Sequence, residues 1–435
     1  MGAGGRDFHV FNTCYRDNSQ CQVVAFTAAQ IPHIEQRSYP TQLAGALYPN
    51  GIPIHSEADL ERIVQDDSID EVVFAYSDVS YESLESTSGR VRAAGAKFST
   101  FDPQRTLLPS SKPCIAVCAV RTGCGKSPLS RLIAAQLREL GLRPGIIRHP
   151  MPYGNLRQQV VQRFAHVDDL SAQHCTIEEM EEYEPHIVAG SVVFAGADYE
   201  QIVAAAESES DVLIWDGGNN DTPFIRPRLL ITLLDPLRAG DEISYFPGRW
   251  NFEHADVLVI GKIDEASTEQ LDILHKNIDQ HNTPATVVEG RLSIHLDKPA
   301  AVHGKRVLIV EDGPTITHGG MSHGAGYLAA ERADADVIDP RPYAVGEIAD
   351  AYEKYAHIGD VLPALGYGEA QLADLQSTIE RVPCDTVVVA TPIDLSRVVH
   401  INKSTARVTY SFEERGTTHL PSLLSKMFGR AASTE

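Results

Sequence analysis

Short apolar runs alternate with amphipathic stretches along the first hundred residues. The β-branched runs "CQVVAFTA" (21–28) and "DEVVFAYSD" (70–78) predict buried strands. Between them, "SEADLERIVQ" (56–65) has the serine start, early acids and apolar spacing of a helix. The stretch "VRAAGAKFSTFD" (91–102) predicts a helix end followed by another strand. Such alternation predicts a parallel sheet with helices on both of its faces.

The same pattern continues to the end of the chain. The strand "PCIAVCAV" (113–120) leads through a glycine loop into the helix "SPLSRLIAAQLRELG" (127–141). Later runs predict further buried strands: "SDVLIWD" (210–216), "ADVLVIG" (255–261), "GKRVLIVEDGPT" (304–315) and "CDTVVVATPIDLSR" (384–397). We therefore predict an α/β protein with three parts: a Rossmann-like N-terminal domain (1–110), a P-loop NTPase-type parallel-sheet domain (111–290) and a C-terminal α/β domain (291–435).

The first residues, "MGAGGRDF", contain a glycine turn of the kind that normally follows a first strand. Either that strand lies upstream of Met1 or the turn is a flexible end, and we favour the first interpretation. As a dinucleotide-binding signal the turn is weak. The run "VVAFTA" ends in Thr27 and Ala28, without the acidic residue that would bind a ribose.

Charge and composition limit the partners and the cellular location that we expect for this protein. The formal net charge of −22 disfavours nucleic acid and anionic membranes as partners. No apolar run is long enough to span a bilayer, and the N-terminus lacks the pattern of a secretory signal, so we expect a cytoplasmic protein. The seven cysteines form no CxxC pair, which argues against a structural zinc and for a reducing compartment.

The loop "RTGCGKS" (121–127) predicts a phosphate-binding site because it lies between a strand and a helix. Gly123 and Gly125 would let the main chain curl around phosphate oxygens, Lys126 would reach the β- and γ-phosphates, and Ser127 would bind Mg²⁺. Val120 stands where the usual pattern has its first glycine. We predict that ATP and Mg²⁺ are the cofactors and that the nucleotide contacts Thr122, Gly123, Cys124, Gly125, Lys126 and Ser127.

A second strand supplies an acid for the metal. In "SDVLIWDGGNNDTPF" (210–224), Asp216 ends the apolar run, and we predict that it holds Mg²⁺ directly or through water. Asp221 is either a second metal or base candidate or a turn residue. In "GKID" (261–264), Gly261 replaces the amide side chain that would select guanine, so the motif is either a base-recognition remnant or a solvated Lys–Asp strand end.

Cationic residues point to an anionic acceptor. Arg148 and His149 directly follow a predicted strand, so we expect them at the carboxyl edge of the sheet with a role in catalysis alongside Lys126 and Asp216. Other arginines either bind the acceptor or pair with surface acids: Arg157, Arg163, Arg226, Arg228 and Arg238. The loop "THGGMSHGAGY" (317–327) is a second anion site or a lid, and His318 and His323 lack a third metal ligand.

Taken together, "GRDFHVFN", "VVAFTAAQIP", "LAGALYPNGIPI", "RTGCGKS", "RHPMPYGNL", "DGGNNDTPF" and "THGGMSHGAGY" resemble the cyclic 2,3-diphosphoglycerate synthetase family over essentially the whole chain. The resemblance implies an ATP- and Mg²⁺-dependent ligase that forms an intramolecular phosphoanhydride in 2,3-diphosphoglycerate and releases ADP and phosphate. It associates Gly123, Gly125, Lys126 and Ser127 with the nucleotide and Asp216 with the metal. Gly261 stands where asparagine is expected in relatives, which leaves the choice between ATP and GTP open.

This reading predicts a small anionic phosphorylated substrate, no nucleic-acid or membrane partner, and a homodimer as one conceivable assembly. Two alternatives remain open. One is a kinase of another anionic acceptor, because the loop region also resembles lipid A disaccharide kinases. The other is a nucleotide-switched GTPase or regulatory module, a class that "GKID" favours. Turnover stimulated by a small phosphorylated acid would separate an enzyme from a switch.

Overall fold

The computed structural model describes residues 1–2, 5–29, 37–149, 156–317, 320–365 and 369–429. They divide into two compact units. Unit 1 comprises residues 1–165, 191–291 and 414–435, and unit 2 comprises residues 166–190 and 292–413. Unit 1 therefore contains most of the first two predicted domains, whereas unit 2 combines most of the third with a segment from the second. None of the described helices is long and apolar enough to cross a membrane.

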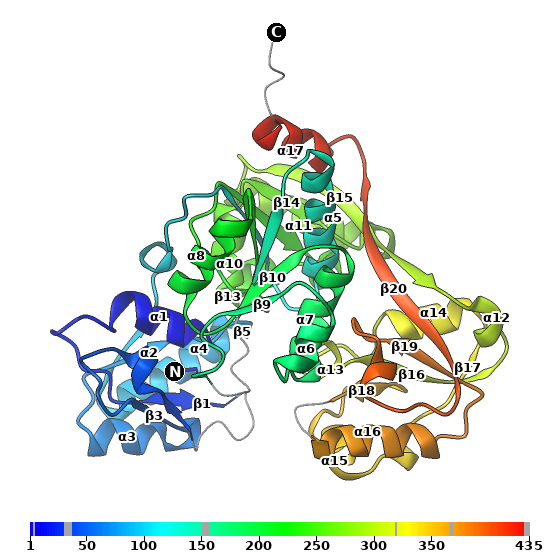
Figure 1. The fold of residues 1–435 in the computed structure, drawn as a ribbon, viewed down its shortest axis with the longest axis horizontal. Coiled ribbons are helices and arrows are strands. Elements are labelled where there is room, and N and C mark those ends of the chain that lie inside the picture. The colour runs from blue at the N-terminus through cyan, green and yellow to red at the C-terminus, as the bar shows by residue number, and fades with distance from the viewer. Residues whose placement is uncertain (3–4, 30–36, 150–155, 318–319, 366–368, 430–435) are drawn as a thin grey trace, which may run out of the picture. The chain divides into compact units, whose positions relative to one another are not determined.

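The N-terminal part of unit 1 is drawn in blue in Figure 1. Its elements are α1 Arg6–Cys14, β1 Phe26–Ala28, β2 Ser38–Tyr39, α2 Thr41–Ala44, β3 Ile52–Ser56, η1 Glu57–Asp59, α3 Leu60–Asp66, β4 Glu71–Phe74, β5 Val79–Ser80, α4 Tyr81–Ala94, β6 Lys97–Thr100 and η2 Pro103–Thr106. Ser56 accepts a hydrogen bond from the Ala58 N–H, as its predicted place at a helix start requires.

This N-terminal part differs from a single parallel sheet. β1 pairs with β3 and β4 pairs with β6, both in parallel, but the described strands form two separate small sheets. The strand predicted over residues 21–28 is confirmed only for its last three residues, Phe26–Ala28. The backbone of Met1 and Gly2 bonds to Thr27 on one side and to Val73 and Ala75 on the other. The first residues are therefore ordered, and the interpretation of a flexible end is wrong for them.

The rest of unit 1 is built on a mostly parallel sheet with the strand order β15-β14-β12-β7-β11-β8-β10-β9. Its strands are β7 Cys114–Ala119, β8 Pro144–Arg148, β9 Gln162–Phe164, β10 Val192–Ala195, β11 Val212–Asp216, β12 Leu229–Leu234, β14 Val257–Ile260 and β15 Thr286–Leu296. Its other elements are α5 Lys126–Glu139, α8 Tyr199–Glu209, η3 Pro236–Arg238, α9 Asp241–Ser244, β13 Tyr245–Phe246, α10 Gly248–His254, η4 Ile263–Glu265, α11 Thr268–His281 and α17 Leu420–Phe428. β9, at the edge, runs antiparallel to its neighbour β10.

Alternating side chains give the central strands two buried faces. Trp215 and Ile147 belong to the hydrophobic cluster that packs against α8. Successive residues of a strand point to opposite faces, so the next residues, Asp216 and Arg148, point to the other face. The helix α5 packs on β7, β11 and β8 from outside that cluster. The charged ends of two buried strands therefore lie on the face that α5 covers.

Unit 2 holds a smaller parallel sheet with the order β17-β16-β19-β20, in which β18 also pairs with β16. The predicted strands near residues 304–315 and 384–397 are confirmed as β16 and β19. Its elements are α6 Asp168–Ala172, α7 Ile177–Val188, α12 Pro299–Val302, β16 Arg306–Asp312, α13 Gly313–Ile316, α14 Ala325–Arg332, β17 Asp336–Val337, η5 Arg341–Tyr343, α15 Gly346–Lys354, β18 Leu362–Ala364, α16 Glu369–Arg381, β19 Thr386–Ala390, η6 Leu395–Arg397 and β20 Ser404–Arg415.

Just before the glycine loop, the backbone of Val120 lies very close to Asn220 and to α10. The carbonyl of Val120 accepts a hydrogen bond from Nδ2 of Asn220 at 2.9 Å. A Cβ atom added at Gly248, the first residue of α10, would collide with that carbonyl and lie 2.8 Å from Nδ2 of Asn220. Gly248 therefore lets α10 approach the backbone of Val120, the residue that stands where the usual loop pattern has its first glycine.

We predict that Gly248→Ala lowers the free energy of unfolding by about 1–3 kcal/mol, because the added methyl group overpacks this contact. Gly89→Ala is the matched control: a Cβ at Gly89, inside α4, meets nothing within 4 Å. It should raise stability by roughly 0.5–1 kcal/mol through helix propensity. Urea denaturation measures both values. Equal stability of the two variants would contradict the packing argument.

Candidate functional site

The glycine loop has the backbone that its sequence predicts. Gly123 and Gly125 have φ angles of +80° and +102°, in the left-handed region that other residues rarely adopt. α5 begins directly after Gly125, so the N-terminus of this helix opens at the loop. A helix N-terminus carries unpaired N–H groups and a partial positive charge that favour an anion. The predicted order of strand, loop and helix is confirmed.

Lys126 and Ser127 form the first turn of α5. Nζ of Lys126 donates a hydrogen bond to the backbone carbonyl of Asn219. Burial lowers the pKa of Lys126, and the nearby carboxylate of Asp216 opposes that effect. A second link joins the loop to the same segment, because Oγ1 of Thr122 donates to Oδ1 of Asn219 at 3.1 Å. The lysine, the loop and the segment after Asp216 are thus brought together.

Asp216 and Arg148 form a buried ion pair. They are register partners at the ends of β11 and β8, and Nη1 of Arg148 lies 2.6 Å from Oδ2 of Asp216. Their side chains are 2% and 0% exposed. Removing one partner of such a pair typically costs about 3–5 kcal/mol, because an uncompensated charge stays buried. The sequence predicted that Arg148 would bind an acceptor. In the structure it pairs with Asp216, the residue predicted to hold Mg²⁺.

His149 pairs with the other predicted acid. Its Nδ1 lies 2.7 Å from Oδ2 of Asp221, whose side chain is fully buried. Burial raises the pKa of Asp221, but the charges of His149 and Arg6 lower it further, so the net shift is downward. Asp221 is therefore an ionised member of a charge network. It also ends a turn, as the alternative interpretation predicted, because its N–H donates to the Gly218 carbonyl at 3.0 Å. The rest of "RHPMPYGNL" up to Asn155 lies outside the described residues.

The positive charge opposite Asp221 comes from the first helix of the chain. Arg6 is 3% exposed, and its Nε lies 3.7 Å from Oδ1 of Asp221. Its guanidinium donates to the carbonyl of Thr222 and stacks over the ring of Phe224, 4.1 Å from the centroid. Burial lowers the pKa of Arg6 to about 10, so it remains charged at neutral pH. His9, one turn further along α1, stacks on Phe224 at 3.9 Å.

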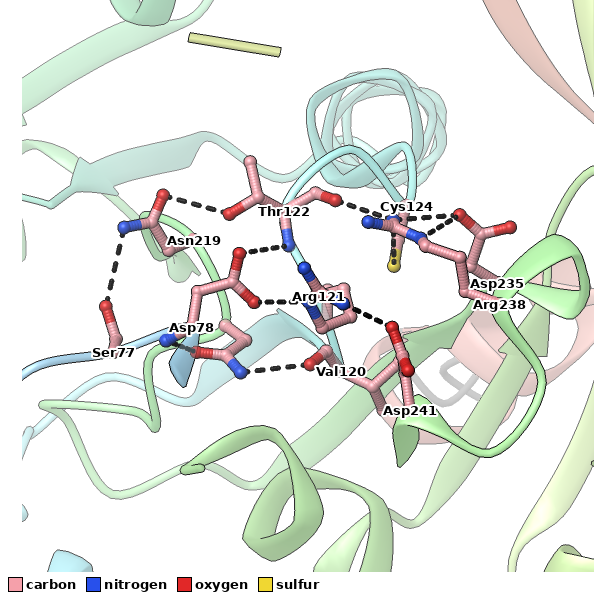
Figure 2. A network of polar contacts seen from close by, with 12 residues as sticks. Ser77, Asp78, Val120, Arg121, Thr122, Cys124, Asn219, Asp235, Arg238 and Asp241 are labelled. Atoms are coloured by element: carbon pink, nitrogen blue, oxygen red, sulfur yellow. Dashed lines mark hydrogen bonds and ion pairs between the residues drawn. The ribbon is translucent and has the colours of Figure 1, made fainter. Parts of the chain in front are cut away.

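A network of polar contacts connects the glycine loop to neighbouring segments of the chain (Figure 2). Asp78, which follows β4, accepts a hydrogen bond from Nε of Arg121 at 2.7 Å and one from the Thr122 N–H at 3.4 Å. Its own N–H donates to Oδ1 of Asn220 at 2.6 Å. Arg121 also pairs with Asp241. The N-terminal part of the chain therefore helps to hold the glycine loop.

A second buried acid lies at the end of β12. Asp235 accepts from Lys262 at 2.8 Å and from Arg238, whose Nη2 also donates to the Thr122 carbonyl at 2.6 Å. Lys262 of the "GKID" motif is 6% exposed, so the interpretation of a solvated lysine is wrong. Asp264 of the same motif is half exposed and lies 3.3 Å from Arg291.

The remaining predicted cations do not gather at the loop. Arg163 is exposed and forms a surface pair with Glu209 at 2.6 Å. Arg157, Arg226 and Arg228 are exposed as well. In unit 2, Oγ of Ser322 lies 2.9 Å from Nδ1 of His323, whereas His318 falls outside the described residues. The surface-pairing alternative therefore describes Arg163.

The described donors fit a magnesium–nucleotide complex better than a metal bound by protein alone. Within the described residues, no group of three or more His, Cys, Asp or Glu side chains could hold a metal ion. Mg²⁺ commonly takes one or two protein ligands together with phosphate oxygens and waters. Ser127 and Asp216 supply a hydroxyl and a carboxylate of that kind.

Several residues of the site were not predicted from the sequence. Asn219 and Asn220 directly follow the Asp216-Gly-Gly turn, and this position was an available signal. Arg121 lies inside the loop motif itself. Arg6 and Asp78 come from distant segments, and no local pattern connects them to the loop.

Comparisons with known proteins give one strong similarity. No protein-family model matches the chain. The arginine synthetase ArcE of Thermococcus kodakarensis is 54% identical over 427 residues, which cover 98% of this chain and 95% of that protein. Cyclic 2,3-diphosphoglycerate synthetase of Thermococcus sibiricus is 22% identical over 311 residues, or 65% of this chain and 68% of that protein. The predicted resemblance to the second enzyme is thus present but distant.

Solved structures are less similar. LpxK from Aquifex aeolicus in complex with ATP has a TM-score of 0.44 at 13% identity, covering 74% of this chain and 90% of that one. The Zn(II)-bound YjiA GTPase from E. coli has a TM-score of 0.28 at 15% identity, covering 41% and 57%. These values do not decide between the alternative functions. The identity over almost the full length of both chains does decide the family: this protein belongs to the family of the arginine synthetase ArcE.

Proposed function

We propose that this protein is an ATP-dependent arginine synthetase that replaces the urea oxygen of citrulline with nitrogen from ammonia. The observation that carries the proposal is the 54% identity to an arginine synthetase over 98% of the chain. Arginine has a nitrogen where citrulline has its urea oxygen, so ATP can drive the exchange by phosphorylating that oxygen. Citrulline, ammonium and ATP then give arginine, ADP, phosphate and one proton.

The residues at the glycine loop suit the phosphoryl-transfer half of this reaction. Lys126 would lie along the β- and γ-phosphates, and the backbone around Gly123 and Gly125 would surround their oxygens. Ser127 and Asp216 would hold Mg²⁺, which supplies charge neutralisation for the transferring oxygens when bound. Arg148 would hold Asp216 in place through their 2.6 Å ion pair. Transfer of this kind needs positioning and charge neutralisation more than a strong base.

The charge balance of the site supports an acceptor that is not a polyanion. Arg148 and Arg238 each pair with a buried carboxylate. Binding a polyanion through them would require those pairs to break. The formal net charge of −22 favours the approach of the ammonium cation and opposes that of a multiply charged anion. Citrulline, which has no net charge at neutral pH, meets no such opposition.

A second candidate is the formation of cyclic 2,3-diphosphoglycerate, which the 22% similarity over 65% of the chain favours. The two reactions share one chemical logic. In each, a phosphoryl group activates an acceptor oxygen, and a nucleophile then displaces phosphate. That nucleophile is ammonia in one case and the neighbouring phosphate of the substrate in the other. The same loop and metal residues would serve both.

We expect the purified protein to convert citrulline, ammonium and ATP into arginine, ADP and phosphate in equal amounts. Chromatography of the amino acids, with phosphorus NMR of the phosphates, measures all of the products. The matched reaction contains 2,3-diphosphoglycerate in place of citrulline and ammonium. A cyclic phosphoanhydride in that reaction, with no arginine in the first, would replace the proposal with the second candidate.

Lys126→Ala should lower the rate of ADP formation about 10²-fold or more, because the lysine charge stabilises the transferring phosphoryl group. The exposed Lys276 of α11 provides the control, and Lys276→Ala should leave the rate unchanged. A steady-state assay of ADP release, with circular dichroism to confirm folding, checks both variants. If Lys126→Ala turns over at a near-normal rate, the glycine loop is not the site of phosphoryl transfer.

A further inference from the structure

The imidazole of His149 is held as a base. Its Nδ1 lies 2.7 Å from Oδ2 of the ionised, fully buried carboxylate of Asp221, and so close a carboxylate favours the tautomer with the proton on Nδ1. Nε2 then has a lone pair. Among the residues that the structure describes, none forms a hydrogen bond with Nε2. The His149 side chain is 16% exposed, which leaves it accessible to a small molecule.

The position of this ring is strictly determined. A Cβ atom added at Gly218 would lie 2.8 Å from Cγ and 2.9 Å from Cδ2 of His149, so only glycine leaves room for the imidazole there. Phe224 lies on another side, with ring centroids 6.2 Å apart. The turn that follows Asp216 thus provides both the surface under the imidazole and the acid at its Nδ1.

Arg6 keeps the acid in its charged form. It is the cation closest to Asp221 apart from His149, with Nε at 3.7 Å, and the rings of Phe101 and Phe224 exclude water from it. Burial raises the pKa of Asp221, and the charges of a protonated His149 and of Arg6 outweigh that effect. The charge of Arg6 remains when His149 is neutral. An ionised carboxylate at Nδ1 orients the imidazole so that Nε2 is the nitrogen turned away from Asp221.

The other charged and titratable groups near His149 are already committed. Arg148, its neighbour in the chain, pairs with Asp216, and the Tyr199 hydroxyl donates to the Arg148 carbonyl at 2.7 Å. Nε2 of His9 donates to the Thr106 carbonyl at 2.7 Å, and burial with the charge of Arg6 lowers the pKa of His9 to about 3. His9 is 1% exposed, whereas the His149 side chain is 16% exposed, so His149 is the more accessible imidazole of the two.

We propose that His149 is the base that removes a proton from ammonium before it attacks the activated citrulline, with Asp221 and Arg6 as positioning residues. This inference rests on the proposed arginine synthetase activity. Ammonium has no lone pair, so one proton must leave before a C–N bond can form. The His149 ring lies against Gly218, and the next residue, Asn219, accepts the hydrogen bond from Nζ of Lys126, so the base adjoins the segment that contacts the glycine loop.

The step balances in atoms and charge. Ammonium gives one proton to Nε2, and His149 releases it to water. The resulting ammonia forms a bond to the urea carbon, which carries the phosphorylated oxygen. The bond between that carbon and the oxygen breaks, and phosphate leaves with the oxygen and with a second proton from the attacking nitrogen. The products are arginine and phosphate, and the dyad returns to its starting form.

The test compares two nucleophiles. Hydroxylamine is largely unprotonated at neutral pH, so it does not need the base, whereas ammonium does. His149→Gln should lower kcat/KM for ammonium by about 10²–10⁴-fold. With hydroxylamine, which would give N-hydroxyarginine, the loss should be less than tenfold. Raising the pH toward the range where ammonia is unprotonated should restore much of the variant's rate with ammonia.

Asp221→Asn should show the same selective loss in a weaker form, because the amide leaves Nδ1 a partner without the charge. His275→Gln, a substitution on the distant helix α11, is the control and should change neither rate. ATP affinity measured by calorimetry confirms that the variants are folded. Equal losses with both nucleophiles in His149→Gln would overturn the assignment. A wild-type protein that makes no arginine from either nucleophile would instead refute the proposed function, and the base with it.

Discussion

The buried ion pair between Arg148 and Asp216 is the interaction on which the site depends. Parallel pairing of β8 with β11 places the two residues in register at the carboxyl end of the sheet, and the alternation of side chains points both toward α5. Neither charge is stable in a dry interior without the other. Their pairing therefore keeps a carboxylate near Lys126, where the proposed metal-bound nucleotide would need one.

Around this pair, distant segments of unit 1 supply the remaining charges. Asp78 holds the glycine loop through Arg121 and Thr122, and Arg6 reaches Asp221 from the first helix. The N-terminal part thus supports the glycine loop and the end of the sheet that carries Asp216 and Asp221. Buried carboxylates, each with a cationic partner, give the site a nearly balanced charge. Such balance suits the chemistry of a neutral urea group.

The sequence predicted those features of the site that depend on neighbouring residues in the chain. The loop, the start of α5 and Asp216 follow from apolar runs, glycines and the place of an acid at a strand end. The partner of Arg148 could not be predicted, because it depends on which strand lies beside β8. Arg6 contacts Thr222 across 216 positions of sequence, which no periodicity encodes. The sequence alone could not distinguish an anionic acceptor from a neutral one, because phosphate-binding residues look alike in every γ-phosphoryl transfer and the carboxylate partners of the arginines are not visible in it.

The central claim is that the γ-phosphoryl group of ATP activates the oxygen that nitrogen then replaces. Citrulline labelled with ¹⁸O in its urea group tests it most directly. The phosphate formed with arginine should contain one labelled oxygen per molecule, seen as an isotope shift in its phosphorus NMR signal. Unlabelled phosphate formed together with arginine would mean that ATP is cleaved without phosphorylating citrulline, and the account would be wrong.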